Sequence, residues 1–173
     1  MAKARRVFFS FDYDRDCWRA AQVRNSWVSK GGMQVAGFFD AVEWEKVKKQ
    51  TPEAIRQWIN KQLEGTSVTV VLIGAKTSES QWVRYEIKES RRRGNALLGI
   101  YIHQLKDQYG KTDQKGKDPF AELGCPSVPI YDWVDDNGYA NLGNWIEKVY
   151  DLMLSEKLRE ATRYLLTSKK QRK

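Results

Sequence analysis

Two acidic features of the sequence lie where parallel α/β sheets bind ligands. Trp82 and Glu86 are four residues apart in a segment of helical periodicity, so their side chains lie one turn apart. An aromatic ring beside a carboxylate can bind a cationic aromatic ligand and stabilise a developing positive charge. The same spacing also fits a surface glutamate beside a core tryptophan, and the pattern alone leaves both interpretations open. Asp12 and Asp14, which directly follow an apolar run, form the second acidic feature.

Several familiar sites are absent from the sequence. A phosphate-receiver domain could use Asp12 and Asp14, but it also needs an acceptor aspartate after the third strand, where the sequence reads Ile73-Gly74-Ala75. There is neither a GxGxxG fingerprint nor a P-loop. The single histidine, His103, lies in a strand-like segment, where a structural role is favoured over a catalytic one.

The elements that position these residues alternate regularly along the chain. Short apolar runs predict five strands, and helical periodicity predicts helices between them. The strands are expected at 7–11, 34–39, 67–73, 96–102 and 128–134, and the helices at 15–28, 51–63, 79–93 and 142–153. This alternation predicts a flavodoxin-like, three-layer α/β sandwich around a five-stranded parallel sheet.

Local signals place the ends of these elements. Thr51 before Pro52 is typical of a helix start, and Ser78 with Gln81 matches a capping box for the helix that follows. Gly94 is expected to end that helix. Residues 104–118 are expected to form a loop, and residues 40–50 an irregular charged stretch around Trp44.

Length and charge indicate one domain with a basic end. The chain has 173 residues, 41% of them apolar, which suits a single core formed by residues 1–154. Residues 155–173 read as a basic helical extension and tail. Four of the eight net positive charges come from Lys169, Lys170, Arg172 and Lys173, so a solvated tail is favoured and nucleic acid is not expected as a partner.

The remaining composition bears on the cellular compartment. No apolar run is long enough to span a bilayer, and no secretory signal is visible, so we expect a cytoplasmic protein without a membrane partner. Cys17 and Cys125 match no metal-ligand spacing, which agrees with a reducing compartment and predicts no metal site.

Four segments together resemble the TIR-like family, most of all the TIR-like proteins of the Thoeris anti-phage defence system. These segments are residues 6–11 (RVFFSF), 23–28 (VRNSWV), 67–74 (SVTVVLIG) and 82–87 (WVRYEI). The resemblance runs from Arg6 to about Leu154. It implies a TIR-like fold and an enzyme that cleaves NAD⁺, releases nicotinamide and makes a cyclic ADP-ribose-type signal. In the family this signal activates a separate effector protein, and NAD⁺ is the substrate, with no further cofactor.

The resemblance also implies roles for individual residues. Glu86 matches the catalytic glutamate of the family's W-x-x-x-E motif, and Trp82 matches its tryptophan. The nucleotide pocket is implied to include the end of the first strand and the loop that covers the site: Ser10, Phe11, Asp12 and Trp44. Members of the family often act as homo-oligomers. The alternative function is a non-catalytic TIR-like module that works by homotypic assembly.

Overall fold

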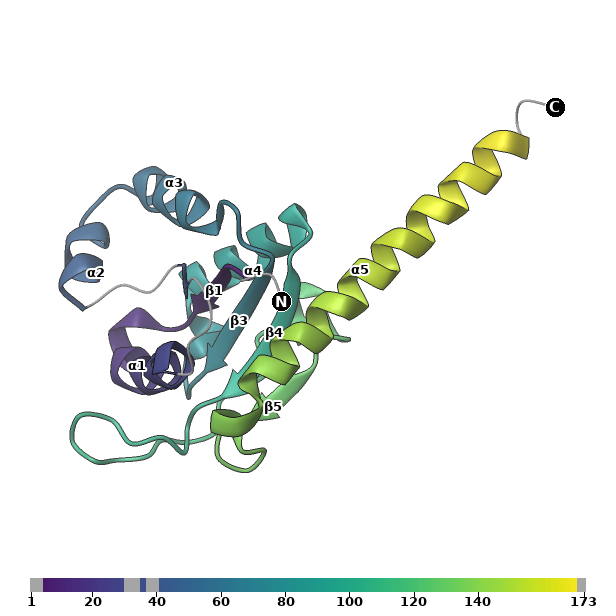
Figure 1. The fold of residues 1–173 in the computed structure, drawn as a ribbon. Coiled ribbons are helices and arrows are strands. Elements are labelled where there is room, and N and C mark those ends of the chain that lie inside the picture. Colours follow the sequence, from purple (N-terminus) through teal and green to yellow (C-terminus); the bar gives the residue numbers. More distant parts are fainter. Residues whose placement is uncertain (1–4, 30–34, 37–40, 171–173) are drawn as a thin grey trace.

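A parallel β-sheet forms the centre of the computed structural model, which describes residues 5–29, 35–36 and 41–170. Neighbouring strands are all parallel and lie in the order β2-β1-β3-β4-β5 (Figure 1). Their bounds are β1 Val7–Ser10, β2 Val35–Ala36, β3 Val68–Ile73, β4 Ala96–Tyr101 and β5 Ile130–Asp132. In flavodoxin-like sheets of this order, ligands bind at the carboxyl ends of β1 and β3. The expected α/β fold around a parallel sheet is confirmed.

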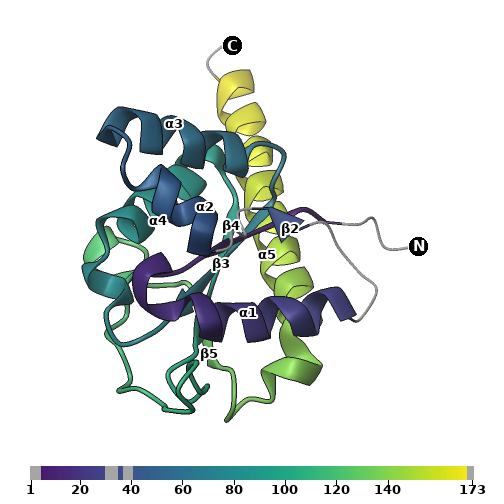
Figure 2. The same cartoon turned by 90° about the vertical axis from the view of Figure 1, so that its left-hand side faces the viewer.

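Helices cover both faces of this sheet. On one face, α1 (Tyr13–Ser29) and α5 (Gly138–Lys170) share a core cluster with the strands. On the other face, α3 (Pro52–Leu63) and α4 (Gln81–Arg93) bury apolar residues against β1 and β3. Figure 2 shows these layers from the side on which α1 lies in front. Every residue of β1 and β3 is buried, as expected for strands covered on both faces.

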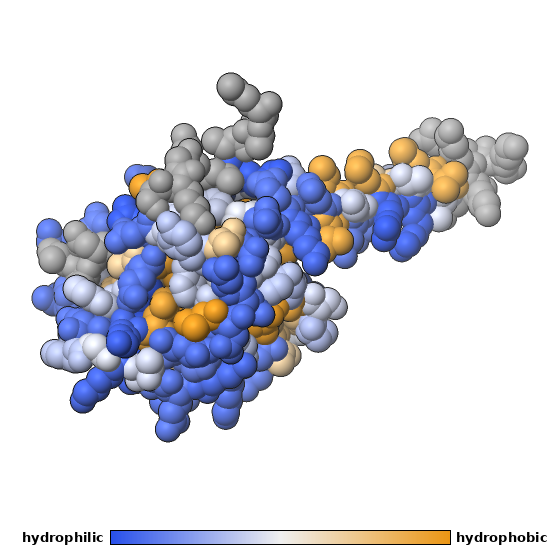
Figure 3. Space-filling model, turned by 60° about the horizontal axis from the view of Figure 1, so that its bottom comes forward, coloured by the Kyte–Doolittle hydropathy of each residue, from blue (hydrophilic) through white to orange (hydrophobic). Residues whose placement is uncertain are grey.

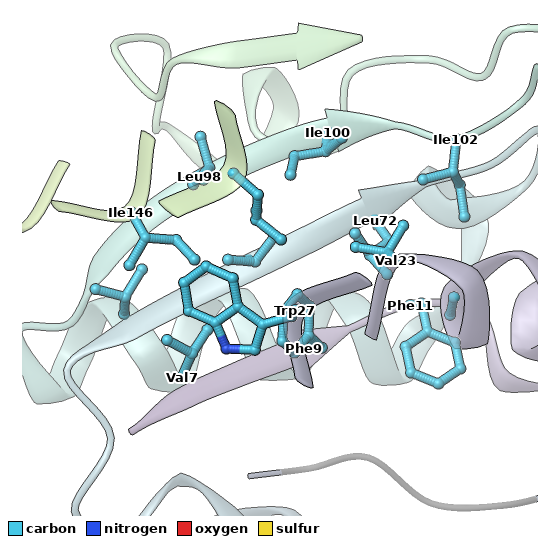
Figure 4. Packing of buried hydrophobic residues seen from close by; sticks show 14 of the residues in the cluster. Val7, Phe9, Phe11, Val23, Trp27, Leu72, Leu98, Ile100, Ile102 and Ile146 are labelled. Atoms are coloured by element: carbon cyan, nitrogen blue, oxygen red, sulfur yellow. The ribbon is translucent and has the colours of Figure 1, made fainter. Parts of the chain in front are cut away.

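The larger core cluster joins α1, α5 and the strands. In Figure 4, the indole of Trp27 lies over Val7 and Phe9 of β1, and Ile146 of α5 approaches from the side. All four side chains are at most 6% exposed. Burial of this kind contributes roughly 1.5–3 kcal/mol for each large apolar side chain. This packing holds β1 and β3 in place, and with them the residues that follow their carboxyl ends.

Most helix ends follow the sequence signals, with one correction. Thr51 caps α3, where its side chain accepts a hydrogen bond from the Ala54 N–H at 3.2 Å. Gly94 ends α4 in the left-handed conformation, with φ 74°. The capping box at Ser78 is wrong: Ser78 lies inside the short 3-10 helix η1 (Thr77–Glu79), and Ser80 caps α4. Ser80 accepts the hydrogen bond because its extended backbone leaves the Val83 N–H within 3.5 Å of its hydroxyl.

The stretch around Trp44 is also different from the expectation. Residues 41–47 form the helix α2 (Ala41–Val47), so an irregular stretch there is wrong. Seven residues give too few helical turns for a clear periodic signal. The second strand was expected over 34–39; the structure describes Val35–Ala36 as β2, and the other positions lie outside the described residues.

The last third of the chain holds a long loop and a long helix. Residues 104–118 form the expected loop, followed by the 3-10 helix η2 (Ala121–Leu123). β5 is shorter than the expected strand at 128–134, because a turn begins directly after Asp132. α5 continues unbroken through position 154, so the division into residues 1–154 and 155–173 stays a prediction. Among the helices that the structure describes, none is both long and apolar enough to cross a bilayer.

Candidate active site

Glu86 is a fully buried carboxyl group at the end of β1. It lies on α4, between Val83 and Ile87, which pack onto the sheet and are both fully buried. Ser90, one turn further on, lies 2.8 Å from Thr69 of β3 through their hydroxyl oxygens. These contacts turn one side of α4 toward the sheet and carry Glu86 with it. The interpretation of Glu86 as a surface residue is therefore wrong.

Ser10 is the direct partner of this carboxyl group. Its hydroxyl, at the carboxyl end of β1, donates a hydrogen bond to Glu86 Oε2 at 2.5 Å. The other oxygen, Oε1, has no hydrogen-bond partner among the described residues. Burial raises the pKa of Glu86 to about 8, and the hydrogen bond from Ser10 lowers it only in part. With no bound ligand, Glu86 is therefore mostly protonated at neutral pH.

An aromatic cluster follows the carboxyl end of β1, the same strand end at which Ser10 contacts Glu86. The ring of Tyr13, at the start of α1, lies 4.2 Å from that of Phe11 and stacks on that of Trp44 at 4.6 Å. Burial raises the pKa of Tyr13 well above its usual value, and Glu86, when ionised, raises it further. Trp58 of α3, 6.4 Å from Trp44, continues the cluster.

Two hydrogen bonds hold α2 and Trp44 over this cluster. The Trp44 indole N–H donates to Asp14 Oδ1 at 3.1 Å, and the Lys48 ammonium donates to the same oxygen at 3.0 Å. Trp44 is only 4% exposed. Trp44 thus stacks on Tyr13 from α2, a helix in place of the expected loop, and its role in covering the site stays a prediction.

The six predicted site residues are not equally close to one another. Glu86 and Ser10 are in contact, and Phe11 and Trp44 are joined to each other through the ring of Tyr13. Trp82, one turn before Glu86, is half buried. It packs against the core cluster of α1, α5 and the strands and against the smaller cluster between α3 and β1. Asp12 instead caps α1, where its side chain accepts a hydrogen bond from the Asp14 N–H. The functional roles of all six stay predictions.

Comparison with known proteins places the chain in a family. Residues 8–107 match the family model described as Thoeris protein ThsB, TIR-like domain. The chain belongs to this ThsB family. It is also 45% identical over 143 residues to a Bacillus cereus (strain MSX-D12) protein named "Putative cyclic ADP-D-ribose synthase ThsB1", covering 82% of this chain and 71% of that protein. The matched region of the family model includes Ser10 and Glu86.

A buried ion pair near the end of β3 was missed by the sequence analysis of this ThsB-family protein. Asp16 and Arg19, both in α1, are 1% and 4% exposed, and their side chains are 3.1 Å apart. Burial raises the pKa of Asp16 to about 6. Arg19 also donates to the carbonyl oxygens of Leu105 and Lys111, so it ties the 104–118 loop to α1. The i,i+3 spacing of opposite charges was the available signal.

Gly74 explains why this ThsB-family site holds no acceptor aspartate after β3. A Cβ at position 74 would lie 2.1 Å from Asp16 Oδ2, so no side chain fits there. His103 lies just beyond β4, with Nδ1 3.7 Å from Asp132 Oδ2, and no contact to Glu86 is seen. Within the described residues, no group of three or more His, Cys, Asp or Glu side chains is placed to hold a metal ion.

Proposed function

We propose that this protein cleaves NAD⁺, releasing nicotinamide and forming a cyclic ADP-ribose-type product. The observation that carries the proposal is the environment of Glu86: a fully buried carboxyl group, hydrogen-bonded to Ser10, with one oxygen unpartnered among the described residues and an aromatic cluster after the same strand. The name of the Bacillus cereus relative supports the same reaction.

The nicotinamide ring of NAD⁺ fits the chemistry of this enclosure. It is a flat pyridinium cation, which aromatic faces attract through their negative π-surfaces. The only cause that lowers the pKa of Glu86 is the hydrogen bond from Ser10, with no cation among the described residues acting on it, so a bound pyridinium would supply the missing positive charge. A cation beside a carboxyl group lowers its pKa. Binding of NAD⁺ is therefore expected to drive a proton from Glu86 and leave it ionised.

One ionised carboxylate suffices for the bond cleavage. The C–N bond between ribose and nicotinamide breaks, and nicotinamide leaves as a neutral molecule with the bonding electron pair, so no general acid is needed. Most glycosides, in contrast, need a second carboxyl group to protonate the leaving group. Ionised Glu86 stabilises the oxocarbenium-like transition state, and Ser10 orients the carboxylate.

The fate of the ribosyl cation depends on access of water. Attack by a nucleophile within the same molecule, an adenine nitrogen or a hydroxyl group, closes a ring and releases one proton. Attack by water gives free ADP-ribose. The rings of Tyr13 and Trp44, each at most 5% exposed, keep water from Glu86 and favour the cyclic product.

The partners of this protein follow from that product. We propose that the cyclic product acts on a separate effector protein as a signal in anti-phage defence. We also propose that the active form of this protein is a homo-oligomer. NAD⁺ is the substrate, and the proposed reaction uses no further cofactor and no metal.

The test is nicotinamide release from NAD⁺ by wild type, Glu86→Gln and a matched control, with and without lysate from phage-infected cells. Glu79→Gln is the control, since it makes the same substitution at an exposed side chain that pairs with Lys76. We expect Glu86→Gln to lose about two orders of magnitude or more of activity, and Glu79→Gln to lose none. Mass spectrometry of the product separates cyclic ADP-ribose from ADP-ribose. A folded Glu86→Gln variant with wild-type turnover would refute the proposed role of Glu86, and a wild type inactive in every condition would favour the non-catalytic assembly module.

A further inference from the structure

The second half of α5 projects away from the body of the protein (Figures 1 and 2). Its first half packs on the sheet through Leu142, Trp145, Ile146 and Val149, which are all buried. Beyond Met153 the helix continues to Lys170 without covering the sheet. We call residues 154–168 the arm. Orange side chains along the arm in Figure 3 mark it as apolar on one side as well as exposed.

An apolar stripe runs along the arm at heptad spacing. Leu154, Leu158, Ala161 and Leu165 follow one another at intervals of four, three and four residues, the spacing of the a and d positions of a coiled coil. The three leucines are 42%, 61% and 60% exposed. Such a row of exposed leucines is unfavourable in water and is typical of a helix that packs against another helix.

This stripe cannot turn onto the body of its own chain. Leu158 lies nine residues after Val149, which is two and a half helical turns, so the two side chains point in opposite directions. Val149 is 5% exposed and faces the sheet. The helix would have to break or rotate by half a turn to bury both residues. The partner of the stripe is therefore another molecule.

We propose that the arms of two copies of this chain pair with each other in antiparallel orientation. In this arrangement Leu154 of one copy lies opposite Leu165 of the other, and Leu158 lies opposite Ala161. The large and small side chains thus face each other along the seam, which allows close packing. The proposal gives an interface for the homo-oligomer of the proposed function, but it uses none of the chemistry of Glu86 and stands if that chemistry fails.

The charges along the helix favour the antiparallel direction. Residues 151–160 contain Asp151, Glu156 and Glu160 together with Lys157 and Arg159, a net charge of −1, whereas residues 161–170 contain Arg163, Lys169 and Lys170 and no acidic residue, a net charge of +3. Antiparallel pairing brings the acidic half of each helix beside the basic half of the other, whereas parallel pairing would bring the two basic halves together. Charges of this kind select orientation and partner in coiled coils.

A groove at the base of the arm extends the contact surface. It has a volume of about 400 Å³ and is lined by Leu152 and Met153 of α5, Val128, Pro126 and Arg91. Antiparallel pairing carries the tip of each arm, with the exposed Leu166, toward the base of the other. The arm provides only about two heptads, fewer than a coiled coil usually needs to be stable alone. We therefore expect a weak dimer whose population rises with protein concentration in the micromolar range.

An anionic membrane is the other class of surface that an amphipathic basic helix can bind. The polar side of the arm carries Glu156 and Glu160 together with Arg159 and Arg163, so it lacks the uniformly basic flank that anionic lipids favour. A second copy, which has both charge signs in complementary halves, fits better. Membrane binding is therefore an outcome of the test below that would overturn the proposal.

The test compares two neighbouring substitutions on the full-length chain. Leu165→Glu places a charge in the stripe, and Tyr164→Glu places the same charge beside it, on a side chain that is 72% exposed and off the stripe. Sedimentation velocity from about 1 µM to about 200 µM should show a monomer–dimer equilibrium for wild type and Tyr164→Glu. For Leu165→Glu, which loses the contact twice per dimer, we expect a Kd at least about tenfold higher. Equal dimerisation of the two variants, or a monomeric wild type throughout, would overturn the proposal.

A cross-linking experiment separates the two orientations. Leu154→Cys and Leu165→Cys variants carrying different tags are mixed and oxidised, and wild type, with its free Cys17 and Cys125, gives the background. Antiparallel pairing predicts mixed disulfides between the two variants, and parallel pairing predicts disulfides within each variant alone. Flotation with vesicles containing phosphatidylserine completes the test. If wild type stays monomeric and binds these vesicles, and the Leu165→Glu variant does not bind them, the proposal is overturned in favour of a membrane.

Discussion

The buried carboxyl group of Glu86 makes the stability of the protein depend on pH in a predictable direction. The pKa of Glu86 is about 8 in the folded chain and near 4.5 in the unfolded chain. Between these values the folded state binds one proton more than the unfolded state, so the free energy of unfolding falls as pH rises. The slope for one proton is about 1.4 kcal/mol per pH unit, which amounts to about 3 kcal/mol between pH 5 and pH 7.5.

Replacing Glu86 with glutamine should remove this slope. At pH 5 the variant should lie within about 1–3 kcal/mol of wild type, because a neutral amide replaces a neutral acid and any difference comes from hydrogen bonding. At pH 8 the variant should be the more stable protein. Urea unfolding at intervals from pH 5 to pH 8 measures the difference in free energy of unfolding between the two proteins. The contribution of Asp16, whose pKa is about 6, cancels in this difference because both proteins contain Asp16. Glu79→Gln, at an exposed position, should run parallel to wild type. If the curve for Glu86→Gln is parallel as well, Glu86 is already ionised in the folded protein, and the account of its burial is wrong.

Two further predictions concern stability. Trp82→Ala should lower the free energy of unfolding by about 2 kcal/mol, since Trp82 is half buried against α3, whereas Trp18→Ala, at 56% exposure, should change it by less than about 0.5 kcal/mol. A Trp82→Ala variant with the wild-type unfolding midpoint and no nicotinamide release would instead identify Trp82 as a ligand contact. Deletion of residues 169–173, which contain no apolar residue, should leave the melting temperature of the body nearly unchanged at low protein concentration, and a loss of many degrees would show that the tail packs on the body.

Much of the scaffold follows from local patterns in the sequence. β3 was predictable because SVTVVLI is β-branched and apolar throughout, and α3 because a threonine cap and a proline precede a clean helical stripe. α2 was not predictable in the same way. Its seven residues carry a single large anchor, Trp44, whose packing partner Tyr13 lies thirty-one residues earlier in the chain.

The burial of Glu86 was visible in the sequence as a spacing that admitted two interpretations. Val83, Glu86, Ile87 and Ser90 occupy positions i, i+3, i+4 and i+7 of one helix, so the glutamate belongs to the stripe that faces the sheet. A carboxylate in an apolar stripe is usually assigned to solvent because its burial is costly. Only the three-dimensional structure shows the serine at the end of β1 that receives it.

On the proposed mechanism, the charge of Glu86 and the position of α2 are coupled. The hydrogen bond from Trp44 to Asp14 contributes only about 1 kcal/mol, and the exposed contact of Lys48 with the same carboxylate is screened by water. Displacing α2 would admit water to Glu86 and remove the main cause of its raised pKa, so an open site favours the ionised carboxylate. Closure over an empty site returns the proton, because the buried charge has no counter-ion. Closure over a pyridinium ring keeps Glu86 ionised, because the ligand supplies the opposite charge inside the enclosure. On the proposed mechanism, the resting protein therefore holds Glu86 in the protonated form, which cannot stabilise the transition state, and a bound pyridinium ring makes the closed site compatible with the ionised carboxylate.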